Sequence, residues 1–158
     1  FENSYLINKV NLVKAHANEA KLNSKTIILY LLEPINETWA KESSAEIEAL
    51  NYFADNIDCL IAANKAKIKL RPHPSEPLNK YTSWVAQKTN LDAEIETEVS
   101  LEKQIAEADF VVGCHTFAMI IAFEAGKRVI CSIPPWGPRS KLKTINLEYL
   151  STLSKKRR

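Results

Sequence analysis

The chain has 158 residues, of which 46% are hydrophobic and 25% charged, so it is long enough for one globular domain with a buried core. Its formal net charge is +2, but four basic residues stand together at the end, and without them 17 Lys and Arg face 19 Asp and Glu. A nucleic-acid-binding face needs Lys and Arg clustered within the fold, so this balance argues against that class of function. The three cysteines follow neither a CxxC pair nor a metal-ligand spacing, which indicates buried, reduced thiols.

Hydrophobic residues along the chain alternate between helical and strand-like spacing. The pattern predicts a first helix over about 3–22, a strand covered on both faces over 26–32, and a second helix that starts from a capping signal at Ser43-Ser44 and runs to about Asn64. The remaining strands are expected over 67–70, 93–99, 110–114 and 128–133, and the remaining helices over 76–89, 100–108, 116–125 and 147–153.

Strands that alternate with helices of this length indicate βαβ crossovers. The predicted fold class is therefore α/β: a single Rossmann-like domain with a parallel sheet of about five strands and helices on both faces. We expect an N-terminal helix at 1–25, the Rossmann-like domain itself at 26–140, and a C-terminal helix with a basic tail at 141–158.

Ligands of such sheets bind beyond the carboxyl ends of the strands. The loops expected at that edge are 33–42, 71–76, 113–116 and 134–140. The chain contains only three glycines, so it has no Gly-rich phosphate loop of the Rossmann or P-loop kind. Function is therefore sought in the side chains of these four loops.

The segment Arg71-Pro72-His73-Pro74 directly follows a predicted strand. Its two prolines cannot continue a central strand, and they stiffen the backbone. Arg binds phosphate or carboxylate through two parallel hydrogen bonds, and His can donate to a phosphate oxygen and stabilise charge on a leaving group. The alternative is structural: His73 bonds a nearby carbonyl in a turn, and Arg71 pairs with a surface acid. Spacing alone favours neither interpretation.

A second candidate loop, Gly113-Cys114-His115-Thr116, joins a buried strand to a helix. Gly113 would let a ligand approach the backbone closely. Thr116 or His115 would present a side chain where the free N–H groups of the helix attract anions. Simple capping by Thr116, with His115 as a bystander, is the commoner outcome for such a threonine.

The other two loops give weaker signals. Trp136 is a candidate stacking surface for a base, but packing of its loop onto the core is the favoured interpretation. Glu33 and Glu37 could hydrogen-bond ribose or a sugar hydroxyl, but solvated loop acids are the more frequent case for such residues.

Four stretches, TIILYLLEPINE, IKLRPHPSEP, SLEKQIAEADFVVG and TFAMIIAFEAGKRVI, together resemble the C-terminal half of bacterial GT-B glycosyltransferases. The resemblance covers residues 26–138. It is closest to the sialyltransferase and polysialyltransferase-like enzymes of capsule and lipooligosaccharide synthesis, which carry a His-Pro motif. Capsular ketodeoxyoctonate transferases and glycerophosphotransferases that use CDP-glycerol are similar through the same element. In these families the C-terminal domain binds an activated nucleotide donor.

The resemblance implies roles for individual residues. His73 would be the catalytic residue, which contacts the donor phosphate and assists its departure. Thr116 would bind phosphate as one of a Ser/Thr pair whose first member is His115 here. The full donor-binding set would be Arg71, Pro74, Glu76, Gly113, His115 and Thr116. The glutamate that holds ribose in many GT-B enzymes is replaced by Ile121, a departure from the family pattern.

The resemblance also implies a function and its partners. The chain would be the donor-binding domain of a sialyltransferase-like glycosyltransferase in surface-polysaccharide synthesis, with a CMP-linked nucleotide-sugar donor, a glycan acceptor, no cofactor and no metal. The alternatives are a domain that transfers glycerol phosphate from CDP-glycerol, and a non-catalytic binding or assembly module. GT-B enzymes work between two domains, so an N-terminal domain is expected to be missing and the isolated domain to be inactive.

The expected location is the bacterial cytoplasm. No apolar run in the chain approaches the ~20 residues of a membrane span. The basic tail Lys155-Lys156-Arg157-Arg158 is either a solvated terminus or a peripheral contact with anionic lipid at the inner membrane.

Overall fold

The computed structural model describes residues 3–17 and 25–157, and it shows an α/β fold built on one six-stranded, all-parallel sheet. The strands are β1 (Thr26–Leu31), β2 (Ala66–Arg71), β3 (Asp92–Ile95), β4 (Phe110–Gly113), β5 (Arg128–Cys131) and β6 (Glu148–Tyr149). The helices are α1 (Ser4–Ala17), α2 (Ala45–Asp55), α3 (Asn79–Gln87), α4 (Leu101–Glu107), α5 (Ala118–Glu124) and α6 (Leu150–Arg157). The predicted fold class is confirmed.

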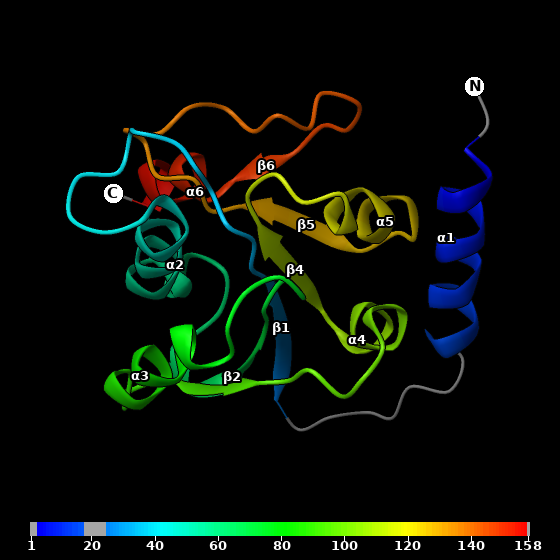
Figure 1. Cartoon of the computed structure of the whole chain (residues 1–158), viewed down its shortest axis with the longest axis horizontal. Helices are drawn as coiled ribbons and strands as arrows, with labels where there is room; N and C mark the ends of the chain where they lie inside the picture. Colours follow the sequence, from blue (N-terminus) through cyan, green and yellow to red (C-terminus); the bar gives the residue numbers. More distant parts are fainter. Residues whose placement is uncertain (1–2, 18–24, 158) are drawn as a thin grey trace.

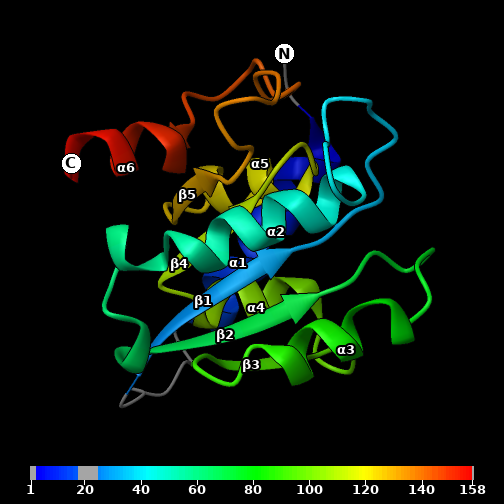
Figure 2. The same cartoon turned by 90° about the vertical axis from the view of Figure 1, so that its left-hand side faces the viewer.

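The strand order is β3-β2-β1-β4-β5-β6, so the chain adds strands on one side of β1 and then crosses to the other side. Right-handed crossovers place α2 and α3 on one face of such a sheet, and α4 and α5 on the opposite face. Figure 1 shows this arrangement, with α6 on the side of α2, and with α1 packed outside α4 and α5. Figure 2 shows α2 and α3 in front of the sheet.

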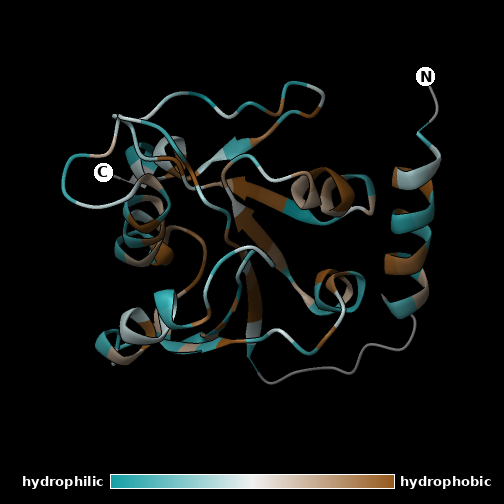
Figure 3. Ribbon diagram, in the orientation of Figure 1, coloured by the Kyte–Doolittle hydropathy of each residue, from teal (hydrophilic) through white to brown (hydrophobic). Residues whose placement is uncertain are grey.

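β1 lies at the centre of the sheet and is buried on both faces, as its apolar sequence predicts. Ile27, Leu29 and Leu31 belong to the core beneath α1, α4 and α5. Ile28 and Tyr30 alternate with them and belong to the core on the α2 side. Figure 3 shows β1, β4 and β5 as the hydrophobic centre of the molecule.

The second helix is shorter than predicted. Ser44 stands at its N-cap, but the Ser44 hydroxyl makes no capping hydrogen bond. The helix ends at Asp55 rather than Asn64, and two short 3-10 turns carry the chain on to β2. The sequence pattern cannot separate these turns from the helix, because their apolar residues continue the helical spacing.

The C-terminal part of the sheet also differs from the prediction. The helix expected over 147–153 begins only at Leu150, because Glu148 and Tyr149 pair with β5 as a sixth strand. Two residues are too few to produce an alternating pattern in the sequence. Residues 18–22 of the first predicted helix lie outside the described residues. Among the helices that the structure describes, none is long and apolar enough to cross a membrane.

Phe53 tests the assignment of the core on the α2 side. Its ring is fully buried and lies 5.1 Å from the ring of Tyr30. Phe53→Ala leaves a cavity there, so it should lower the free energy of unfolding by about 3–5 kcal/mol in a denaturant titration. Phe123→Ala on α5 is the matched control, because that side chain is 37% exposed; it should cost about 1 kcal/mol or less. Equal losses in the two variants would contradict this core.

Candidate functional site

Four loops meet at the carboxyl edge of the sheet, where the sequence predicts them. β1 and β4 are neighbours, but the loop after β1 leads to α2 on one face and the loop after β4 leads to α5 on the other. Such a divergence is a topological switch point, where open α/β sheets bind ligands. The loop after β5 closes against the loop after β4, since the Ser140 hydroxyl donates to the Cys114 carbonyl at 2.6 Å.

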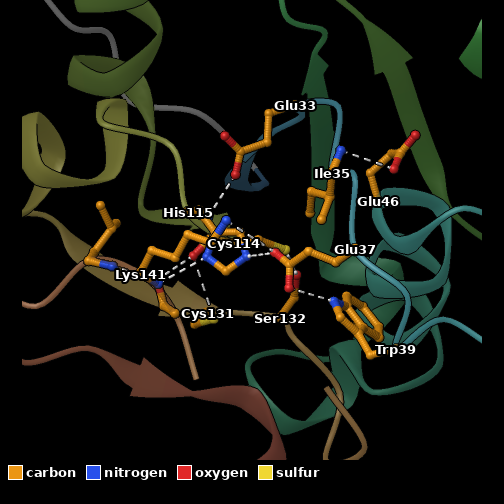
Figure 4. Close-up of polar contacts among 12 residues, drawn as sticks. Glu33, Ile35, Glu37, Trp39, Glu46, Cys114, His115, Cys131, Ser132 and Lys141 are labelled. Atoms are coloured by element: carbon orange, nitrogen blue, oxygen red, sulfur yellow. Dashed lines mark hydrogen bonds and ion pairs between the residues drawn. The ribbon is translucent and has the colours of Figure 1, made fainter. Parts of the chain in front are cut away.

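Glu33 lies at the centre of this edge, shortly after the end of β1. Its Oε1 accepts a hydrogen bond from the His115 backbone N–H at 2.8 Å (Figure 4). Burial raises the pKa of the Glu33 carboxyl, and the nearby His115, His73 and Lys141 offset part of that rise. The Glu33 carboxyl therefore joins the loops after β1 and β4.

The His115 ring is fixed from two sides. Its Nδ1 accepts from the backbone N–H of Lys141 at 3.0 Å, so the proton of the neutral ring is assigned to Nε2. His115 Nε2 lies 2.8 Å from Glu37 Oε1, a close polar contact without good hydrogen-bond alignment, and no described residue gives either atom a hydrogen-bond partner. Trp39 Nε1 donates to the other Glu37 oxygen at 3.1 Å.

The interpretation of His115 as a bystander is therefore wrong. So is the interpretation of Glu33 and Glu37 as solvated loop acids, since Glu33 accepts a backbone hydrogen bond and only 18% of the Glu37 side chain is exposed. Figure 4 shows His115 between Glu33 and Glu37, with Lys141 beside its ring. This group, Glu33, Glu37, His115 and Lys141, is called the switch-point cluster below.

His73 stands on the loop after β2 with an exposed side chain, next to the exposed Pro74. Its Nδ1 accepts from the Ser75 backbone N–H at 3.1 Å and lies 2.7 Å from the Ser75 hydroxyl. Because Nδ1 acts as an acceptor, the neutral ring carries its proton on Nε2, which points this donor away from the turn. The His73 backbone N–H donates in turn to Glu76 Oε1 at 3.3 Å.

A buried charged cluster supports this loop. Lys80 Nζ donates to Glu46 and to Glu76 at 2.5 Å each, and the Tyr81 hydroxyl donates to the same Glu76 oxygen. Glu46 also accepts from the Ile35 backbone N–H at 3.2 Å, so the cluster links the loops after β1 and β2. Burial raises the pKa of Glu46, but the hydrogen bonds from Lys80 and from backbone N–H groups outweigh burial, and its net pKa is lowered.

Arg71 faces away from the loop that carries His73. Its Nη1 donates to the Val99 carbonyl and to Gln104 Oε1, both at 2.8 Å. Leu70 belongs to the core on the α2 side, so the alternation of β2 turns Arg71 toward the α4 layer. The hydrogen bonds of Arg71 therefore connect the end of β2 to α4 and to the segment before it.

Gly113 and Thr116 have structural explanations. A Cβ atom at Gly113 would lie 3.0 Å from Met119 Sδ, so the glycine lets β4 and α5 pack closely. α5 begins at Ala118 with Phe117 as its N-cap, and no side chain caps it, so the predicted capping by Thr116 is wrong. Neither residue joins the switch-point cluster through a hydrogen bond that the structure describes.

Sequence reasoning overlooks Lys80, Lys141 and the buried position of Glu46. The spacing of Glu76 and Lys80, four residues apart within the helix predicted over 76–89, is a signal for one of these contacts. The others join residues far apart in the chain, which no local pattern reveals. Within the ranges 3–17 and 25–157, no group of three His, Cys, Asp or Glu side chains is arranged to hold a metal ion.

No protein-family model matches the chain, and no curated protein matches its sequence. Among solved structures, it is similar to Thermosulfurimonas dismutans KpsC, a beta Kdo 2,7 transferase (TM-score 0.48, 19% identity, 97% of this chain and 52% of that one). It is also similar to T. dismutans KpsC, beta Kdo 2,4 transferase (TM-score 0.49, 14% identity, 98% of this chain and 56% of that one). A third similar structure is that of the wall teichoic acid polymerase TagF (TM-score 0.48, 10% identity, 96% of this chain and 38% of that one). The chain spans about half or less of the length of these structures.

Lys80 tests whether the charged cluster holds the two loops together. Lys80→Met would leave the carboxylates of Glu46 and Glu76 close to each other without their shared cation. The free energy of unfolding at pH 7 should fall by about 2 kcal/mol, measured by denaturant titration. Lys143→Met, at an exposed position, is the matched control and should change it by less than about 0.5 kcal/mol.

The free energy of unfolding that Lys80→Met loses should become smaller as the pH falls. Because the folded-state pKa of Glu46 lies below its ordinary value of 4.5, the carboxylate stabilises the wild type above that pH, and this contribution disappears as the pH falls through the folded-state pKa. The difference between wild type and Lys80→Met should therefore shrink steadily below about pH 4.5. A difference that stays constant between pH 7 and pH 3 would show that Lys80 acts only through packing.

Proposed function

We propose that this chain is the donor-nucleotide-binding domain of a glycosyltransferase in bacterial surface-polysaccharide synthesis. The class of reaction is suggested by the sequence resemblance to the C-terminal half of GT-B enzymes. The place for the donor is suggested by the meeting of the loops after β1 and β4 at the switch point, and by the hydrogen bonds of Glu46, Lys80 and Glu76 that link the loop after β2 to the loop after β1. The activities named for the structural neighbours, Kdo transfer and wall teichoic acid polymerisation, add donors of these polymers to those worth testing.

The observation that carries the proposal is the position of the proton on the neutral His73 ring. Ser75 engages Nδ1 through its backbone N–H, which leaves the Nε2–H as an exposed hydrogen-bond donor beyond the end of β2. Pro72 and Pro74 restrict the backbone on both sides of His73, and Glu76 holds its N–H. A ring so oriented loses little freedom when it donates to a ligand.

The chemistry follows from this donor. The bond between the anomeric carbon of the sugar and a phosphate oxygen breaks while an acceptor hydroxyl attacks the carbon. Negative charge then develops on the departing phosphate, and a hydrogen bond or a proton from His73 Nε2 stabilises it. Glu76 acts as a positioning residue in this scheme, because its buried carboxylate holds the loop rather than facing solvent.

The finer assignments belong to the same proposal. CMP-sialic acid is the first donor to test and CDP-glycerol the second, since the two share cytidine and a phosphate and differ in the group transferred. Binding requires no metal ion. The acceptor is a glycan, a separate N-terminal domain supplies the group that activates it, and this domain alone does not turn over. The basic tail contacts anionic lipid at the membrane surface.

One observation favours a non-catalytic binding or assembly module instead. The Arg71 guanidinium donates to Val99 and Gln104, so the cation expected beside His73 is engaged elsewhere. The neighbouring carboxylates of Glu33 and Glu37 also reduce the attraction of the edge for a phosphate. Nucleotide binding distinguishes this second function from the first.

The test is a titration of the 15N-labelled chain with CMP, CDP, UDP and GDP, followed by backbone amide shifts. One nucleotide, a cytidine phosphate first, should give saturable shifts at 71–76 and 113–117 with a Kd of about 1 mM or below, and EDTA should not change them. His73→Ala should weaken binding about ten-fold. His16→Ala, on α1, is the matched histidine control and should bind as the wild type does.

Two outcomes would contradict the proposal. Shifts that map elsewhere, or that persist in His73→Ala at full affinity, would place the nucleotide away from the His-Pro loop. Absence of shifts for all four nucleotides at about 10 mM, both in this chain and in a protein that joins it to an N-terminal domain, would favour the non-catalytic module.

A further inference from the structure

A second concave site lies beside α2, outside the switch-point cluster. It is a cavity of about 290 Å³ between one face of α2, from Glu48 to Asp55, the end of the loop before this helix, and the loop after β5. Its lining includes Lys41, Glu42, Asn51, Tyr52, Asp55 and Trp136, and it is called the Trp136 cavity below. Its size is near the lower end of the ~300–1,000 Å³ range of small-molecule sites.

Trp136 is held in place but is not packed away. Its side chain is 43% exposed, against the expectation that it packs its loop onto the core. The indole N–H donates to Glu48 Oε1 at 2.7 Å, and the ring meets Tyr52 edge to face at 5.8 Å. A large apolar ring fixed at the wall of a cavity can bind a ligand without first losing rotamer freedom.

The Glu48 carboxylate holds two walls of the cavity in place by hydrogen bonds. Only 9% of this residue is exposed, although it is a glutamate on the first turn of α2. While Oε1 accepts from Trp136, Oε2 accepts from the backbone N–H groups of Lys41 and Glu42, at 2.8 and 3.2 Å. One buried carboxylate thus fixes both the aromatic wall and the backbone of the opposite rim.

The polar groups of the cavity suit hydroxyl groups better than phosphate. Asn51 Oδ1 accepts from Trp84 Nε1, so Asn51 keeps its amide N–H donors for a ligand. Glu42 and Asp55 are exposed carboxylates, which accept hydrogen bonds from hydroxyls and repel anions. A nucleotide stacked on Trp136 would bring its phosphates near these acids, which disfavours the nucleobase interpretation.

Lys41 does not change this conclusion. Its ammonium group lies 5.5 Å above the centre of the Trp136 ring, a weak contact at an exposed position that a ligand ring can replace. The flexible side chain of Lys41 can then turn toward the hydroxyls of the ligand or toward solvent.

We propose that the Trp136 cavity is a binding subsite for a neutral glycan. One sugar ring lays its apolar face against the Trp136 indole, while its hydroxyls bond to Asp55, Glu42 and Asn51. The carbohydrate character of the ligand follows from the cavity itself. Its assignment to the acceptor polymer rests on the proposed function, since that polymer is the glycan that a surface-polysaccharide transferase would hold near the same edge of the sheet.

The test uses neutral sugars as probes: glucose, galactose, N-acetylglucosamine, lactose and cellobiose, each titrated into the 15N-labelled chain. At least one should shift the Trp136 indole N–H and the Asn51 side-chain signals in a saturable way, with a Kd in the range of about 1–100 mM. Trp136→Ala should weaken this binding about ten-fold or more. Asp55→Asn, which leaves the aromatic wall intact, should weaken it about three-fold or more.

The controls separate this inference from the proposed function. His73→Ala should bind the sugar as the wild type does, and Trp136→Ala should keep any nucleotide shifts at 71–76. Sugar binding without nucleotide binding would therefore support the cavity and contradict only the donor site. The inference is overturned if no probe shifts the indole signal at about 100 mM. It is also overturned if the shifts survive in both variants, or if nucleotides rather than sugars move the Trp136 signal.

Discussion

All six strands of the sheet run parallel, and this constraint determines where every functional loop lies. Each strand leaves the sheet at the same edge, and the order of the strands reverses between β1 and β4. The loops that follow these two strands must therefore separate toward α2 and α5 on opposite faces. Glu33 and His115 meet in the space between them, although 82 residues of chain separate the two.

Buried carboxylates then hold the loops in position, in place of the Gly-rich turns of other nucleotide-binding sheets. Backbone N–H groups of three loops donate to glutamates. The loop after β1 donates to Glu46 and Glu48, the loop after β2 to Glu76, and the loop after β4 to Glu33. Hydrogen bonds to charged acceptors are stronger than neutral ones, so a few of them can fix long loops. The same carboxylates make the edge acidic, and the groups there that suit a phosphate are the donor hydrogen of the exposed His73 ring and the exposed ammonium group of Lys141.

The alternation of strands and helices was predictable because the elements before β6 are long enough to show a hydrophobic pattern. The His-Pro loop was predictable because proline ends a central strand. The direction of Arg71 could also have been predicted, since it follows Leu70, a core residue, and must face the opposite layer. The contacts of His115 with Glu37 and Lys141 could not, because they join three loops distant in sequence. Nor could the hydrogen bond from Trp136 to Glu48, because a helical pattern assigns this glutamate to solvent.

In the proposed function, His73 presents its Nε2–H to a donor phosphate at this edge. The 15N shifts of the His73 ring, measured by long-range 1H–15N correlation without and with CDP, test it most directly. We expect Nδ1 to be the acceptor and Nε2 the protonated nitrogen in the free chain. CDP should move the Nε2 signal strongly while the signals of His16 stay unchanged. A free ring protonated on Nδ1, or an Nε2 signal that a saturating nucleotide leaves in place, would contradict it.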